Sequence, residues 1–315
     1  MKISISFLIP CYNVEKYIAK SISSVLCQKD PRCDTNIIVF DNQSSDATFE
    51  IAKRFQSENP TQVQAFQNSE NRGPAFSINR CWEKSVSEFA ILLHSDNELI
   101  DGALSIFIDY IESGNYKKGI IFGDIEYIDL AGNLIGSWTG KHLGEGHLSN
   151  KHLIENYIDK DGSRFRPLQF LLDRKTFLEV GPYSERFFVD DWEFTIRYLC
   201  HSDIHRINVP VVRFRIRQDS FGHQPETYAD SLMDVIELHE RSLSEKFGLK
   251  PETTYSNTLC RVILMFIHKN QASDAVARFL IYRKKYKNKI KVLEIIFFGL
   301  TEYVKFRFKR VLSLF

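Results

Sequence analysis

Several features are missing from this 315-residue sequence, and each absence excludes a class of protein. The six cysteines contain no Cys-x-x-Cys pair, so we expect reduced thiols. No apolar run reaches the roughly 20 residues that cross a bilayer. Residues 1–10 show no apolar stretch followed by a cleavage site, as a secretory signal would. We therefore expect a cytoplasmic globular protein that does not span a membrane.

Charge is nearly balanced over the whole chain but is distributed unevenly. The formal net charge is +1, whereas residues 281–315 carry ten Lys or Arg against two acids, a net of +8. Apolar residues in this segment recur every three or four positions, at Val292, Ile296, Leu300, Val304, Phe308, Val311 and Phe315. This spacing predicts a helix with one apolar face flanked by basic residues. Such a helix either lies on an anionic membrane surface or packs as a terminal helix with a solvated basic side, and nucleic acid is the weakest alternative.

Strands and helices alternate through the first hundred residues. Strand-like runs cover residues 3–9, 37–40, 63–66 and 89–93. Asn13 and Asp46 are predicted helix N-caps, and Pro74 suits the first turn of a third helix. This alternation predicts an α/β fold with a mainly parallel central sheet covered by helices on both faces. Ligands of such sheets bind at the carboxyl ends of the strands, where Asp41 and Asp96 lie.

The second half of the sequence changes character. Strand-like runs at 120–128 and 134–138 predict a hairpin, and residues 175–180 predict a short helix. Acidic residues open a further helix at 192–199, and residues 209–216 predict another strand. Beyond Pro225 the pattern is helical to the end. We therefore predict a first domain over residues 1–225 and a helical C-terminal region over 226–315.

Five motifs occur in a fixed order between residues 3 and 222. They are Ile9-Pro10-Cys11-Tyr12-Asn13, Asp41 to Thr48, Asn71-Arg72-Gly73, His94-Ser95-Asp96-Asn97 and Phe187 to Glu193. As an ordered set they resemble the GT-A glycosyltransferases of family 2. The resemblance implies a nucleotide-binding half over 1–100 and an acceptor-binding half over 101–225. It also implies inverting transfer of a sugar from a nucleotide sugar, usually with a divalent metal.

The same resemblance implies a set of donor-binding residues. These are Pro10, Tyr12, Asn13, Asp41, Asn42, Arg72, Ser95, Asp96 and Arg217. The loop after the first strand faces the base in that family, and Asp41 with Asn42 matches a pair that recognises uracil or ribose. Asn42 stands where the family often has a second acid, so hydrogen bonds remain without the charge. Alternatively, Asp41 caps its own turn and Tyr12 is an ordinary packing aromatic.

The implied metal motif departs from the family pattern. His94 replaces its leading acid and Asn97 its final one, so Asp96 is the one carboxylate left among residues 94–97. Hard cations favour oxygen ligands, and Mg²⁺ also uses substrate phosphates, so Asp96, Asn97 and the diphosphate are a sufficient set for weak Mn²⁺ or Mg²⁺ binding. His223 either adds a ligand or is simply solvated.

A transferase also needs a base for the acceptor hydroxyl. The resemblance assigns this role to Asp191, with Asp190, Trp192 and Glu193 on the acceptor side. The alternative is that these acids only cap a helix and interact with its dipole. Arg217 is expected to help stabilise the leaving diphosphate.

Two functions remain open at this point. The first is a hexosyl or N-acetylhexosaminyl transferase, UDP-dependent and acting on a glycan or lipid-linked glycan in surface polysaccharide synthesis. It would lie in the cytoplasm, peripheral to the inner face of the membrane, and would bind no nucleic acid. The second is a catalytically weak binding or scaffold protein that kept the fold, which the altered metal motif favours.

Overall fold

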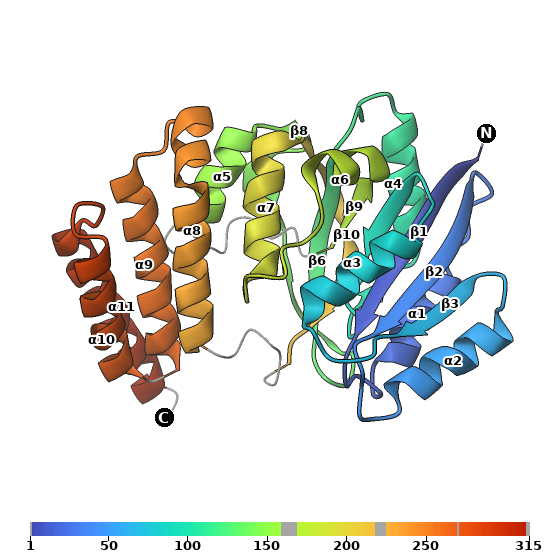
Figure 1. Ribbon diagram of the computed structural model, residues 1–315, viewed down its shortest axis with the longest axis horizontal. Coiled ribbons are helices and arrows are strands. Elements are labelled where there is room, and N and C mark those ends of the chain that lie inside the picture. The colour runs from blue at the N-terminus through green and yellow to red at the C-terminus, as the bar shows by residue number, and fades with distance from the viewer. Residues whose placement is uncertain (1, 159–168, 218–224, 270, 313–315) are drawn as a thin grey trace. The chain divides into compact units, whose positions relative to one another are not determined.

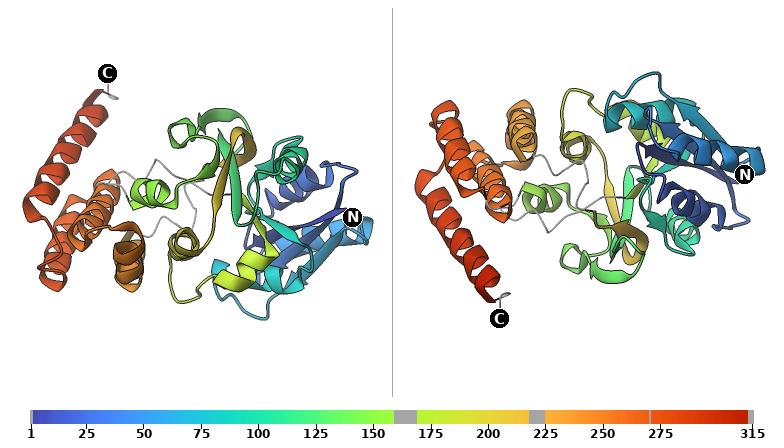
Figure 2. Two further views of the ribbon diagram at one scale, coloured as in Figure 1. Left: turned by 90° about the horizontal axis from the view of Figure 1, so that it is seen from above. Right: turned by 90° about the horizontal axis from the view of Figure 1, so that it is seen from below.

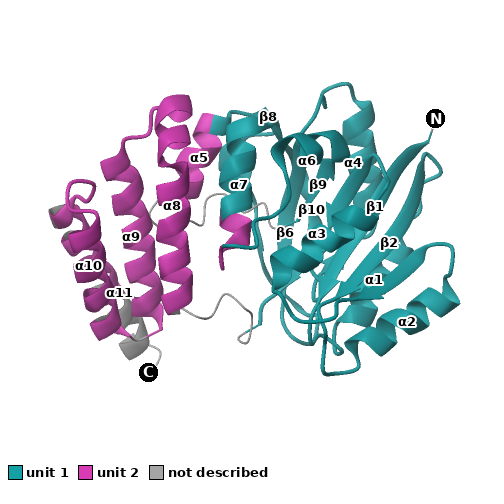
Figure 3. Ribbon diagram, viewed as in Figure 1, with its two compact units in different colours: residues 1–150, 167–186, 193–218 teal, residues 151–166, 187–192, 219–315 magenta. Residues whose placement is uncertain are grey.

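The computed structural model describes residues 2–158, 169–217, 225–269 and 271–312 (Figure 1). The chain divides into two compact units (Figure 3). Unit 1 comprises residues 1–150, 167–186 and 193–218, and unit 2 comprises 151–166, 187–192 and 219–315. Unit 2 thus includes two short segments that precede the predicted boundary at residue 225.

Unit 1 is built on one mixed sheet with strand order β3-β2-β1-β4-β9-β6-β10-β5. Its strands are β1 (Ile3–Cys11), β2 (Cys33–Asp41), β3 (Val63–Gln67), β4 (Phe89–Leu92), β5 (Glu98–Leu99), β6 (Ile120–Ile128), β7 (Leu134–Trp138), β8 (Gly146–Leu148), β9 (Phe170–Asp173) and β10 (Ile204–Arg215). β1, β2, β3 and β4 pair in parallel. β9 runs antiparallel between β4 and β6, and β6 pairs in parallel with β10. β6 and β10 therefore run in the same direction as β1.

Helices cover both faces of this sheet, as the alternation of strands and helices predicts. The helices of unit 1 are α1 (Ile18–Leu26), α2 (Thr48–Glu58), α3 (Pro74–Lys84), α4 (Ala103–Glu112), the 3-10 turn η1 (Lys141–Leu143), α6 (Arg174–Val180) and most of α7 (Asp190–His201). Apolar residues of α1, α2 and α4 share one buried cluster with β1 and β2. On α3, Trp82 stacks on Phe177 of α6, with ring centroids 4.0 Å apart. The strands are apolar on both faces because each face lies beneath helices.

Three predicted local features differ from the structure. Asp46 is not the N-cap of α2, because the helix begins at Thr48 after Ala47, although the Asp46 carboxylate accepts from the Thr48 N–H at 3.0 Å. α1 begins at Ile18 rather than after Asn13, because Asn13 takes a left-handed backbone conformation (φ 49°) and its side chain binds the neighbouring loop. β10 begins at Ile204, five residues before the predicted strand. Its pairing with β6 shifts register between Arg206 and Val212, and residues 208–210 are exposed, so the buried residues 204–207 are separated from the buried part of the predicted strand.

Unit 2 is helical in the part of it that the structure describes. It contains most of α5 (Asn150–Ile158), the first turn of α7, and α8 (Pro225–Phe247), α9 (Pro251–His268), α10 (Ala272–Lys285) and α11 (Val292–Leu312). α9 packs against α8, α10 and α11 (Figure 2). Its residues Tyr255, Leu259 and Phe266 are fully buried. The predicted helical C-terminal region is therefore a bundle arranged around α9.

A helix that crosses a bilayer needs about 20 predominantly apolar residues. Across the described ranges, none is both long enough and apolar enough to cross a bilayer.

Candidate functional site

The candidate site lies at one edge of the unit 1 sheet. β1, β2, β4, β6 and β10 run in one direction, so their carboxyl ends share that edge. Open α/β sheets bind ligands there, because loops that follow the strands leave a crevice lined by backbone and polar side chains. Most of the residues predicted to bind the donor are carried by these loops.

Hydrogen bonds of Asn13 with Ser44 and Ser45 join the loop after β1 to the loop after β2. The Asn13 backbone N–H donates to Oγ of Ser44 at 2.9 Å, and Asn13 Oδ1 accepts from the Ser45 N–H at 2.9 Å. Tyr12 is 46% exposed beside them. Pro10 is buried within β1, opposite Phe40 of β2. This arrangement holds Tyr12 at the surface rather than in the core.

Asp41 is fully buried at the end of β2. Its Oδ2 accepts from the Ser44 N–H at 3.0 Å and from Nε2 of Gln67 at 2.9 Å, and its Oδ1 accepts from the Ser44 hydroxyl at 2.5 Å. Burial, reinforced by the nearby Asp41 carboxylate, raises the pKa of the Cys11 thiol well above its usual value. Cys11 therefore stays a neutral packing group. Asp41 braces the loop that bears the predicted base-binding residues.

Asn42 shapes a second loop, residues 71–73. Its Nδ2 donates to Oδ1 of Asn71 at 2.8 Å and to the Gly73 carbonyl at 3.0 Å, while its Oδ1 accepts from the Arg72 N–H at 3.3 Å. The Arg72 guanidinium is paired with Glu185 at 2.8 Å and lies 4.0 Å from the ring centroid of Phe76. An amide, with both donors and an acceptor, meets these demands better than a second carboxylate would.

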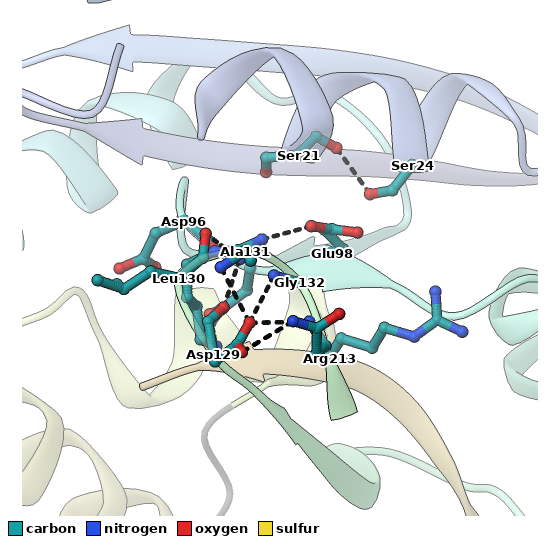
Figure 4. A network of polar contacts seen from close by, with 12 residues as sticks. Ser21, Ser24, Asp96, Glu98, Asp129, Leu130, Ala131, Gly132 and Arg213 are labelled. Carbon is teal, nitrogen blue, oxygen red and sulfur yellow. Dashed lines mark hydrogen bonds and ion pairs between the residues drawn. The ribbon is translucent and has the colours of Figure 1, made fainter. Parts of the chain in front are cut away.

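Asp96 and Arg217, which are 121 residues apart in sequence, meet at the same edge. Arg217 Nη1 lies 3.1 Å from Oδ2 of Asp96. Next to them Arg215 is buried, and its guanidinium donates to the carbonyls of Asp96 and Asp129 and pairs with Glu98. Figure 4 shows Asp96, Glu98 and Asp129 in this network of polar contacts. Arg215 thereby joins the loop after β4 to the turn after β6. Ser95 is buried in the same loop.

The residues predicted to ligate a metal fit a divalent cation poorly. Asn97 is fully buried and its Oδ1 accepts from the Arg215 N–H at 3.0 Å, so its remaining side-chain polar atom is an amide nitrogen, which does not ligate. Asp96 offers one carboxylate, one oxygen of which is paired with Arg217. His223 lies outside the described residues. Within those residues, no three His, Cys, Asp or Glu side chains cluster as a metal site.

The two acids that begin α7 have different environments. Asp190 is buried, and its Oδ1 accepts from the Asp191 N–H at 2.8 Å, whereas Asp191 is exposed. Asp190 thus accepts from the first turn of its own helix, where a negative charge also suits the helix dipole. Asp191 is therefore accessible to solvent on the first turn of the helix.

The neighbours of these acids are engaged in packing. Trp192 is buried and lies against Tyr157, with ring centroids 4.3 Å apart, and against the guanidinium of Arg261 at 4.1 Å. Glu193 is also buried and forms a bidentate pair with Arg197 at 2.8 and 2.9 Å. Both residues were predicted on the acceptor side, and their observed contacts are with protein groups.

Sequence reasoning missed three residues that organise this site. Arg215, Ser44 and Gln67 were not predicted as site residues. Each nevertheless forms a hydrogen bond with a predicted one, Arg215 with Asp96 and the other two with Asp41. Arg213, Arg215 and Arg217 occupy alternate positions at and just beyond the end of β10, a pattern equally typical of a solvated strand face. The sequence therefore gave no sign that the middle arginine is buried.

Comparisons with known proteins agree with this geometry. The model of the family described as "Glycosyl transferase family 2" matches residues 6–179. A Campylobacter jejuni protein, GalNAc(5)-diNAcBac-PP-undecaprenol beta-1,3-glucosyltransferase, is 26% identical over 185 residues, which are 58% of this chain and 56% of that protein. The chain thus spans about half the length of that relative.

Solved structures show the same fold. Residues 1–349 of Staphylococcus aureus TarS, a poly(ribitol-phosphate) beta-N-acetylglucosaminyltransferase, in complex with UDP-GlcNAc superpose with a TM-score of 0.60 at 16% identity, covering 98% of this chain and 92% of that one. A Pyrobaculum calidifontis mannosyltransferase, PcManGT, in complex with GDP-Man and Mn²⁺, gives a TM-score of 0.56 at 13% identity, covering 96% and 88%. The fold is therefore that of the GT-A glycosyltransferases.

Proposed function

The chain belongs to glycosyl transferase family 2, and from that premise we propose that it moves a hexose or N-acetylhexosamine from a UDP-linked donor to a hydroxyl of a growing surface glycan. One observation carries the proposal for this chain. Asp96 and Arg217 meet at the carboxyl edge of the unit 1 sheet, beside the braced loops after β1 and β2. Charged groups concentrated at this edge suit a nucleoside diphosphate.

Two relatives support the classes of donor and acceptor. TarS was crystallised with UDP-GlcNAc, which favours a UDP-linked sugar. The name of the Campylobacter jejuni relative describes an undecaprenyl-diphosphate-linked glycan as its acceptor, which favours a lipid-linked acceptor here. The donor sugar and the acceptor of this chain are parts of the proposal.

The proposed reaction is a single displacement with inversion at the anomeric carbon. Asp191 takes the proton of the acceptor hydroxyl as that oxygen forms a bond to the anomeric carbon. The bond from this carbon to the diphosphate oxygen breaks, and its electron pair leaves with UDP. The exposure of Asp191 on the first turn of α7 supports its assignment as the base.

Negative charge grows on the departing diphosphate, so a positive group must stabilise it. A weakly bound Mn²⁺ or Mg²⁺ at Asp96 is the source that the family resemblance implies. The described residues fit such an ion poorly, since Asn97 is engaged by Arg215 and Asp96 by Arg217. No step of the proposed reaction passes through a metal.

We place the protein on the cytoplasmic face of a membrane, held by unit 2. α10 exposes Val276, Leu280 and Ile281, and α11 exposes Ile296 and Leu300. The basic side chains of Arg283, Lys284 and Lys287 are also exposed. Apolar and basic groups together suit the surface of an anionic bilayer. A lipid-linked acceptor would be presented at that surface.

The experiment is a donor panel. UDP-linked hexoses and N-acetylhexosamines are incubated with the protein and lipid-linked glycan acceptors, and UDP release is measured together with the anomeric configuration of the product. We expect multiple turnovers with one donor and an inverted linkage. Donor binding without turnover would instead support the scaffold alternative, which His94 and Asn97 favour.

A further inference from the structure

The positive charge that the leaving diphosphate needs is present in the chain itself. Arg217 Nη1 lies 3.1 Å from Asp96 Oδ2, and their side chains are 12% and 22% exposed. We infer, resting on the function proposed above, that Arg217 stands in place of the divalent cation. Its guanidinium binds the diphosphate, Asp96 anchors that guanidinium, and donor binding requires no metal.

The surroundings of the pair hold this arrangement in place. Arg215, two residues before Arg217, donates from its backbone N–H to Asn97 and from Nε to the Asp96 carbonyl at 3.0 Å. The guanidinium carbons of Arg215 and Arg217 lie 5.0 and 5.3 Å from the ring centroid of Tyr17, so both arginines contact the same side chain. The loop after β4 is therefore fastened to the end of β10, and Asp96 is fixed beside Arg217.

This environment opposes a divalent cation. Hard cations require several oxygen ligands, and residues 94–97 contribute only one carboxylate. A guanidinium within 3.1 Å of that carboxylate repels a second cation at the same place. The oxygen of Asn97, the other candidate ligand, accepts from the backbone of Arg215.

A guanidinium is chemically suited to the substitute role. It carries five N–H donors in a planar fork that matches phosphate oxygens. Different N–H groups can therefore pair with a carboxylate and bind a phosphate at the same time. Its pKa keeps it charged at every physiological pH. Because Asp96 and Arg217 sum to zero charge, whereas Asp96 with a divalent ion would be positive, UDP binding is expected to be moderate and sensitive to salt.

Calorimetric titration of UDP tests the inference without depending on turnover. Wild-type protein is titrated in the presence of a chelator and, separately, of Mn²⁺, and we expect dissociation constants that agree within about twofold. Arg217→Ala should weaken UDP binding by about tenfold to a hundredfold, the range of a lost hydrogen bond to a charged group. Arg217→Lys should lose less, because it retains the charge without the planar fork.

Arg213→Ala is the matched control. It removes the same charge four residues earlier, within β10, but Arg213 pairs with Glu126 at 3.2 Å, and the variant should bind UDP as the wild type does. UDP binding by the wild type that requires Mn²⁺ would overturn the inference and leave the transferase proposal intact. Failure to bind UDP in either condition would also overturn it. Metal-independent UDP binding without turnover of any donor would support Arg217 while contradicting the transferase.

Discussion

At the scale of single residues, the adjacent acids Asp190 and Asp191 have different environments and different proposed roles. Asp190 is buried and bonded to the start of its own helix, whereas Asp191 next to it is exposed. A buried acid that accepts from the start of its own helix contributes to stability, whereas an exposed acid contributes little. The same dipeptide therefore combines a structural residue with a proposed catalytic one.

Because the two environments differ, alanine substitutions at Asp190 and Asp191 should change the free energy of unfolding by different amounts. Asp190→Ala should lower the free energy of unfolding by about 1–2 kcal/mol, because the Asp191 N–H loses its acceptor and the start of α7 loses a negative charge. Asp191→Ala should change it by less than about 0.5 kcal/mol, as is usual for exposed positions. Urea denaturation of both variants checks this. Equal destabilisation would show that Asp191 also stabilises the start of α7.

Individual side chains were only partly predictable from the sequence. Asp96 and Arg217 were selected as donor-binding residues, and the structure brings them together. The burial of Arg215 and the engagement of Asp41 by Gln67 depend on which strands become neighbours, which is information that a linear pattern does not contain.

At the scale of elements, one arginine fastens α7 to the loop after α6. Arg197 donates to the carbonyls of Val180, Gly181 and Pro182 and pairs with Glu193 through two bonds. The Arg197 and Glu193 side chains are 17% and 4% exposed. This contact lies within unit 1 and sets the helix on whose first turn Asp191 stands.

Substitution of Arg197 should destabilise the folded protein. Arg197→Ala leaves Glu193 buried without its cation and should lower the free energy of unfolding by about 3 kcal/mol. Arg241→Ala is the control, because Arg241 and Glu245 form an exposed pair that is also four residues apart in a helix. The control should leave the urea midpoint unchanged. Similar midpoints for the two variants would contradict the assigned role of Arg197.

The exposed apolar residues of α10 provide a test of membrane attachment. Replacing Val276, Leu280 and Ile281 by serine should reduce binding to vesicles that contain anionic lipid, because less apolar surface is buried on contact. Vesicle co-sedimentation measures the bound fraction, and high salt should also reduce it in the wild type. Undiminished sedimentation of the variant would exclude α10 as part of the attachment surface.

Elements with local signals were predicted well. The parallel β1, β2, β3 and β4 and the helices between them follow from alternating apolar segments and turn residues. β9, a four-residue strand that runs antiparallel between β4 and β6, was not predicted. Its partners are distant in sequence and its apolar run is too short to distinguish a strand from a helix.

At the scale of the whole molecule, a buried histidine links stability to pH. His205 is 1% exposed, its Nδ1 lies 3.0 Å from the Tyr110 hydroxyl and its Nε2 lies 3.2 Å from the Lys118 carbonyl. Burial lowers the pKa of His205 below its ordinary 6.5, although the nearby Asp203 opposes the shift. The folded protein therefore binds fewer protons than the unfolded chain in mildly acidic solution.

Stability should fall as pH falls through about 6.5, the unfolded histidine pKa, by at most about 1.4 kcal/mol per pH unit from this residue. Urea denaturation between pH 7 and pH 5, above the range in which most carboxylates titrate, measures the slope. His205→Gln should flatten it. An unchanged slope in this variant would assign the effect to other groups.

The central claim is that this member of glycosyl transferase family 2 uses Asp191 as the base that activates an acceptor hydroxyl. The most direct measurement is the rate of UDP release by the wild type and by Asp191→Asn, with the donor that the panel identifies and its acceptor. The account predicts a loss of about a hundredfold to ten-thousandfold in the variant, with donor binding retained. Equal rates of release by the two proteins would contradict it.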